Sequence, residues 1–162
     1  MAMDSLVTTL QNLEVFRGIA PEQLAEIVRK ADRMVFRPGQ TVIEAGHQGD
    51  GAYVLVAGDA EVLPDDAETH RGQSVQPGSL VGEMAMLIEH EYRITVVARS
   101  PIRALKITRA QIHAQMQATP KLAEHFVGRI SSRLSRVAVE LRRIDQLLAL
   151  AAEPGPVGHQ HV

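Results

Sequence analysis

The stretch Pro77-Gly78-Ser79-Leu80-Val81-Gly82-Glu83-Met84-Ala85-Met86-Leu87 decides the fold expected for this chain. It follows a series of short β-prone segments and places a glycine directly before a run of good helix formers. Gly82 can adopt backbone angles that other residues avoid, so the sequence predicts a tight turn there and a short helix after it. Such a turn presents free N–H groups and the positive end of the peptide dipoles, an arrangement that binds phosphate.

The carboxylate of Glu83 indicates what kind of phosphate compound such a turn would bind. A carboxylate beside a phosphate is repelled unless it has another role, such as accepting a hydrogen bond from a sugar hydroxyl. Phosphate together with ribose indicates a nucleotide. Glutamate is also favoured in the first turn of any helix by the helix dipole, so Glu83 alone does not distinguish a binding site from a stable helix start.

Length and composition favour a single intracellular domain. The chain has 162 residues, which fits one domain with a helical extension. It has no cysteine, so disulfides and thiolate metal sites are excluded and a reducing, cytoplasmic location is expected. The net charge of −2 gives no general argument for nucleic-acid binding. No apolar run is long enough to cross a bilayer, so we expect no membrane association.

The first 31 residues have helical periodicity. Within residues 4–31, helical spacing is seen first in Leu6, Leu10 and Leu13 and, after a break at Gly18, in Leu24, Ile27 and Val28. Pro21 suits the first position of the second helix, although Ala20 before it is a poor cap.

After residue 33 the pattern changes to short β-prone segments separated by glycine-bearing turns. Residues 65–76 are polar and are predicted to form a surface loop or an edge strand. The predicted fold is therefore α+β and mainly β, an antiparallel, jelly-roll-like β-roll with helices before it and a long helix after it. The predicted strands are 34–37, 40–44, 52–57, 60–63, 94–98 and 102–107.

Two helices are predicted after the strands. The first begins at Thr108 or Arg109 and ends at Met116, and the second begins with Thr119 as its cap and ends near residue 152. Apolar residues in the second helix have heptad spacing, which favours a two-fold dimer seam over 134–148 as an alternative to packing on the helix's own domain. We therefore expect one domain over 1–152, with a dimerisation helix over 119–152, and a disordered tail over 153–162. The apolar stripe consists of Phe126, Ile130, Leu134, Val137, Leu141, Ile144 and Leu148.

In the order of these elements the chain resembles the cyclic-nucleotide-binding domain family, which includes the sensor half of catabolite activator protein and the regulatory subunits of protein kinase A. The resemblance covers roughly 13–150, and its order and spacing are more specific than any single motif. The matching segments are Leu13 to Ile19 (LEVFRGI), Phe36 to Asp50 (FRPGQTVIEAGHQGD), Tyr53 to Val62 (YVLVAGDAEV) and Gly82 to Met86 (GEMAM).

The resemblance implies a β-roll that holds cyclic AMP or cyclic GMP. Backbone N–H groups of Ala85 and Met86 would bind the cyclic phosphate, Glu83 the ribose 2′-hydroxyl, and Val62 and Leu80 the purine. The full set of residues that the resemblance implicates is Val62, Leu80, Gly82, Glu83, Met84, Ala85, Met86, Arg93, Ile94 and Thr95.

The chain departs from the family pattern at the arginine that pairs with the phosphate. Counted from Gly82 without a gap, that position is Tyr92, and Arg93 comes one residue later. In a strand, a shift of one residue turns a side chain to the opposite face. If the loop 89–91 absorbs the shift, Arg93 reaches the phosphate, which is the alternative we prefer. Otherwise Arg93 is a surface charge. In this family, a hydroxyl residue directly after the arginine often goes with a preference for cyclic GMP. The chain has Ile94 at that position, which favours cyclic AMP.

Two functions of different class follow. The first is a cyclic-nucleotide sensor in which ligand binding moves the C-terminal helix. The second is a dimeric interaction scaffold that has the same fold and no longer binds nucleotide. About ten residues follow residue 152, too few for a helix-turn-helix domain, so DNA binding by that route is not expected. The histidines are too scattered for the metal site of a cupin, and no enzyme is predicted. The output partner is not specified by the sequence.

Overall fold

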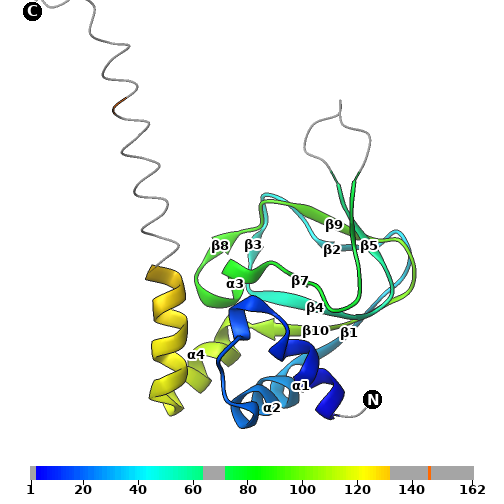
Figure 1. Cartoon of the computed structure of the whole chain (residues 1–162). Helices are drawn as coiled ribbons and strands as arrows, with labels where there is room; N and C mark the ends of the chain where they lie inside the picture. Colours follow the sequence, from blue (N-terminus) through cyan, green and yellow to red (C-terminus); the bar gives the residue numbers. More distant parts are fainter. Residues whose placement is uncertain (1–2, 64–71, 132–145, 147–162) are drawn as a thin grey trace, which may run out of the picture. The chain divides into compact units, whose positions relative to one another are not determined.

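The computed structural model describes residues 3–63, 72–131 and 146, and it divides the chain into two compact units, Met1–His125 and Phe126–Val162. The first unit contains all the described strands (Figure 1). Its helices are α1 (Met3–Gln11), the 3-10 helix η1 (Glu14–Phe16), α2 (Pro21–Lys30), α3 (Glu83–Leu87) and α4 (Arg109–Ala118). A further helix begins at residue 120 and is described to residue 131.

The strands form an antiparallel roll of two four-stranded sheets and a small two-stranded sheet. One sheet has the order β1-β10-β4-β7 and the other β2-β9-β5-β6, while β3 pairs with β8. The strands are β1 (Asp32–Phe36), β2 (Thr41–Ile43), β3 (Gln48–Gly49), β4 (Gly51–Ala57), β5 (Ala60–Leu63), β6 (Gln73–Val75), β7 (Leu80–Val81), β8 (His90–Glu91), β9 (Thr95–Ala98) and β10 (Ile102–Thr108).

The architecture confirms the fold class predicted from the sequence. All six predicted strands are present, and β6 confirms the edge strand expected in 65–76, of which 65–71 lie outside the described residues. The predicted helix starts are also correct: Pro21 is at the first turn of α2, and the Thr108 hydroxyl caps α4 by accepting a hydrogen bond from the Gln111 amide. The strands β3, β7 and β8 were not predicted because two residues are too few for a visible alternation.

The core lies between the two larger sheets. Its centre contains side chains from both sheets and from α3, so the small helix is part of the packed interior. Because interiors are closely packed, the position of α3 depends on the side chains around it. The members of this cluster are Phe36, Val42, Ile43, Tyr53, Leu55, Ala60, Val75, Val81, Ala85, Tyr92, Val96, Ala98, Ile102 and Ala104.

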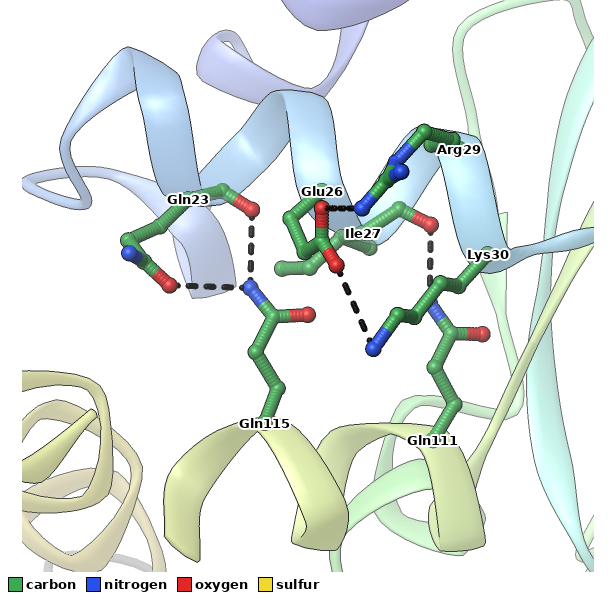
Figure 2. A network of polar contacts seen from close by, with 7 residues as sticks. All are labelled: Gln23, Glu26, Ile27, Arg29, Lys30, Gln111 and Gln115. Carbon is green, nitrogen blue, oxygen red and sulfur yellow. Dashed lines mark hydrogen bonds and ion pairs between the residues drawn. The ribbon is translucent and has the colours of Figure 1, made fainter. Parts of the chain in front are cut away.

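Helix α4 is fixed to α2 by side-chain amides (Figure 2). Gln115, which is 4% exposed, donates to the backbone carbonyl of Gln23 at 2.9 Å and to its side-chain oxygen at 3.0 Å. One turn earlier, Gln111 donates to the Ile27 carbonyl at 2.7 Å. These bonds hold α4 against α2.

Within the described residues, no helix is both long enough and apolar enough to cross a membrane. The predicted dimer seam over 134–148 and the tail over 153–162 lie outside the described residues, apart from residue 146. Dimerisation through this helix therefore stays a prediction.

We expect Gln115→Ala to lower the free energy of unfolding by about 1–2 kcal/mol. The substitution removes two hydrogen bonds to Gln23, each contributing roughly 0.5–1.5 kcal/mol. Its own Oε1 has no partner within the described part of the chain, so removing that atom offsets part of the loss. Urea denaturation of this variant and of the control Gln117→Ala, an exposed glutamine on the same helix, measures the effect. Equal stability of the two variants would show that the amide contacts do not stabilise the packing of α4.

Candidate functional site

The turn at Gly82 has the conformation that the sequence predicts. Gly82 caps α3 with φ 78° and ψ 29°, in the left-handed region that favours glycine. A Cβ atom at this position would also lie 2.9 Å from the Tyr92 ring and 3.3 Å from the Gly51 carbonyl oxygen. Glycine is therefore required at residue 82 both by the backbone conformation and by the space available.

The ring of Tyr92 lies directly in front of this turn. Tyr92 is 9% exposed and belongs to the core cluster, and its hydroxyl donates a hydrogen bond of 2.7 Å to the Gly51 carbonyl. On its other side the ring approaches Gly49, where an added Cβ would lie 2.6 Å from both the Tyr92 ring and the Ala85 Cβ. The ring therefore fills the space between Gly49, Gly82 and Ala85.

The backbone around Tyr92 explains why this residue, and not Arg93, faces inward. Strand β8 pairs with β3, and the pairing continues beyond the strand: the Tyr92 N–H donates to the His47 carbonyl at 2.9 Å, and the Tyr92 carbonyl accepts from the Gly46 N–H at 2.8 Å. These bonds leave no room for a slip of one residue. Tyr92 points into the core and Arg93 is exposed. In this structure Tyr92, and not Arg93, packs against the Gly82 turn, and contact of Arg93 with a phosphate stays a prediction.

Several other predicted residues gather around the same core. Val62 and Ile94 are partly buried and pack against the cluster that contains Tyr92 and Ala85. The partly buried Leu80 lies in β7, paired with Val54 of β4. The structure therefore places Val62 and Ile94 against the core and Leu80 on the edge strand of the other sheet, while their contact with a ligand stays a prediction.

The polar candidates already have partners or are partly buried. The Thr95 hydroxyl accepts a hydrogen bond of 3.0 Å from the Ala45 N–H, and the Ala85 N–H donates to the Gly82 carbonyl at 3.1 Å. Glu83 is partly buried at the start of α3, and Met84 and Met86 are buried. A ligand phosphate would have to compete with the Gly82 carbonyl for the Ala85 amide.

Arg109 is a residue that sequence reasoning missed. Its Nη1 donates to the carbonyls of Gly49 and Ala85 at 2.9 Å and of Ile88 at 3.1 Å. His113, one turn later on α4, has its Nε2 2.8 Å from the Leu87 carbonyl. The signal was an arginine in the first turn of a helix, where the dipole disfavours a cation unless it has other acceptors. Together these side chains attach the C-terminal end of α3 to α4.

An open cavity of about 790 Å³ lies beside Tyr92, next to the small sheet formed by β3 and β8. The cavity is open to solvent, so the side chains that line it have space to move. Within the described residues, no group of three or more His, Asp or Glu side chains is placed to hold a metal ion. The cavity is lined by Ala45, Gly46, Gln48, Glu89, His90, Glu91, Tyr92 and Arg93.

Comparison with known families gives a match to the cyclic nucleotide-binding domain over residues 33–119, more than half of the chain. All ten predicted site residues lie within the match. Two curated relatives are a cAMP-dependent protein kinase regulatory subunit of Aspergillus fumigatus, 29% identical over 62% of this chain, and the cyclic AMP receptor protein of Thermus thermophilus, 26% identical over 78%. The matched regions make up 24% and 60% of these relatives' lengths.

A solved structure supports the same fold. The cyclic nucleotide-binding-like protein of Brucella abortus aligns with a TM-score of 0.65 and 26% identity, covering 70% of this chain and 99% of the other. The roll and its helices are therefore shared with proteins of this kind.

The buried Tyr92 hydroxyl predicts a pH dependence of stability. Burial raises the pKa of Tyr92 above the ordinary value of 10.0. A raised pKa in the folded state gives a stabilisation that is complete below the unfolded-state pKa and is lost as the pH rises through the folded-state pKa. We therefore expect the free energy of unfolding to fall as the pH rises above about 10.

Urea denaturation across this pH range, on the wild type and on Tyr92→Phe, measures the contribution of Tyr92. The variant has no hydroxyl at residue 92 to ionise, so its stability should fall less, while the other groups that titrate in this range are common to both proteins. An equal fall in both would show that the Tyr92 hydroxyl is not buried in solution.

Proposed function

The chain belongs to the cyclic nucleotide-binding domain family, and from this premise we propose that it is a sensing domain that binds a cyclic nucleotide, cyclic AMP in preference to cyclic GMP. The observation that carries the proposal is the family match over 33–119, which includes every predicted binding residue. Both named relatives are cyclic-AMP proteins by name, which supports cyclic AMP for this chain.

Each part of the ligand has a proposed site on the described elements. The turn at Gly82 and the amides of α3 would bind the cyclic phosphate, and Glu83 would accept a hydrogen bond from the ribose 2′-hydroxyl. The purine would lie against Val62 and Leu80, at the margin of the core. Ile94 offers no hydroxyl to a guanine, which favours adenine. Arg93, which is exposed, would contribute only after a change of its backbone.

Arg109 and His113 support a route from the ligand to the C-terminal helix. Both are on α4 and contact carbonyls at the C-terminal end of α3, those of Ala85, Leu87 and Ile88. A ligand that shifts α3 would therefore pull on α4 and on the helix that begins at residue 120. Ligand binding can shift this equilibrium only by the difference in its affinity for the two states.

Dimerisation through 134–148 and a cytoplasmic location remain part of the proposal. The alternative, a scaffold of the same fold without nucleotide binding, has one observation in its favour, which is the Tyr92 ring in front of the Gly82 turn.

Titration calorimetry with cyclic AMP and cyclic GMP tests the proposed ligand. We expect cyclic AMP to bind more tightly, and Glu83→Ala to weaken its binding by about ten- to a hundredfold, because a charge-assisted hydrogen bond contributes roughly 1.5–3 kcal/mol. The matched control is Glu89→Ala, which removes an exposed carboxylate from the neighbouring loop and should bind like the wild type. The absence of heat with both nucleotides would favour the scaffold.

The proposed coupling is tested by hydrogen exchange of the helix at 120–131 with and without saturating cyclic AMP. We expect a ligand-dependent change in the wild type and in Arg103→Gln, an exposed arginine on β10, and a much smaller change in Arg109→Gln, which loses the bonds to α3. The comparison is made at nucleotide concentrations that saturate each protein. A full change in Arg109→Gln would show that Arg109 does not connect α3 to α4.

A further inference from the structure

Resting on the proposed function, we infer that Tyr92 determines which ligands enter the site: its ring occupies the place of the ligand's cyclic phosphate and must swing out before a nucleotide binds. The ring lies in front of the same turn whose amides are proposed to bind the phosphate. A ring and a phosphate cannot share this space. In the absence of ligand, the Tyr92 side chain thus fills the proposed phosphate site.

The space around the ring is shaped for it by small residues. The Gly49 position would place a Cβ 2.6 Å from the ring, and the Gly82 position would place one 2.9 Å from it, so larger residues at either site would displace the tyrosine. Real Cβ contacts do not become this short, and core groups have little freedom to move. The hydroxyl is anchored to the Gly51 carbonyl at 2.7 Å. The small residues therefore leave room for the ring, and the Gly51 carbonyl accepts a hydrogen bond from its hydroxyl.

The charges around the ring also differ from those that a phosphate requires. Arg109 directs its Nη1 to three backbone carbonyls, and Lys106 pairs with Asp50 at 3.0 Å. Arg93 is exposed on the other face of the segment. Neither Arg93 nor Lys106 is therefore placed to give charge-assisted hydrogen bonds to a phosphate at the Gly82 turn, the Arg109 Nη1 is already engaged, and the phosphate would first have to displace a buried ring.

The ring can leave without breaking the backbone pairing. The bonds of the Tyr92 backbone to Gly46 and His47 do not involve its side chain, so a change of its rotamer leaves them intact. The open cavity of about 790 Å³ that borders both Tyr92 and Arg93 provides space for the displaced ring. Entry of a nucleotide costs the hydroxyl bond to Gly51 and the burial of the ring, which lowers the affinity.

The test is titration calorimetry of cyclic AMP with the wild type, Tyr92→Arg, Tyr92→Phe, Arg93→Ala and the control Arg103→Ala, each first shown to be folded by circular dichroism and thermal unfolding. Tyr92→Arg removes the ring and supplies a guanidinium, so we expect at least about tenfold tighter binding than in the wild type. Tyr92→Phe keeps the ring and loses only the anchoring bond, so we expect a gain of about two- to tenfold. The control Arg103→Ala removes an exposed arginine of β10 and should bind like the wild type.

The outcomes separate this inference from the proposed function. Tighter binding by Tyr92→Arg supports the inference whether the wild type binds weakly or not at all. If Tyr92→Arg binds and the wild type gives no heat, only the proposed sensing of cyclic nucleotides is overturned. If the wild type binds and neither Tyr92 variant binds more tightly, the inference is wrong and the proposed function stands. Both fail if every folded variant is silent.

Two further results bear on individual variants. If Tyr92→Arg does not fold, the decision rests on Tyr92→Phe, which preserves the packing of the ring: a gain supports the inference and unchanged affinity overturns it. A loss of binding in Arg93→Ala would also overturn it, because Arg93 would then be the partner of the phosphate.

Discussion

The pairing of the segment before β9 with the turn after β2 is the constraint on which the centre of this molecule depends. Tyr92 gives its N–H to His47 and receives the N–H of Gly46, so its side chain has one direction, inward. A shift by one residue would break both bonds and would place an arginine in an apolar core, where an unpaired charge is costly. The identity of the residue at this position therefore sets the chemistry of the site.

The small helix α3 lies between this position and α4. Its first turn contacts the Tyr92 ring through Gly82, and its C-terminal carbonyls are held by Arg109 and His113. Because α3 has five residues, most of them buried, it can move only as a body. The Tyr92 ring and the side chains of α4 therefore pack against opposite ends of the same short element.

Most of the architecture followed from local signals in the sequence. Alternating strands, the glycine turns and the helix starts at Pro21 and Thr108 were predicted because each is determined by nearby residues. The two-residue strands were not predicted, because they are defined by hydrogen bonds to strands that are distant in the sequence. The same limitation applies at residues 92 and 93: both registers were stated, and the ladder bonds that turn Tyr92 inward join segments about 45 residues apart. Arg109 was missed because its three acceptors come from two distant segments.

The most direct measurement is a crystal structure of the wild-type protein grown with a high concentration of cyclic AMP. The account predicts a nucleotide whose phosphate lies at the Gly82 turn and a Tyr92 ring rotated toward the cavity bordered by Arg93, with its bond to the Gly51 carbonyl broken. A nucleotide bound at this turn while the ring remains between Gly49 and Gly82 would contradict it.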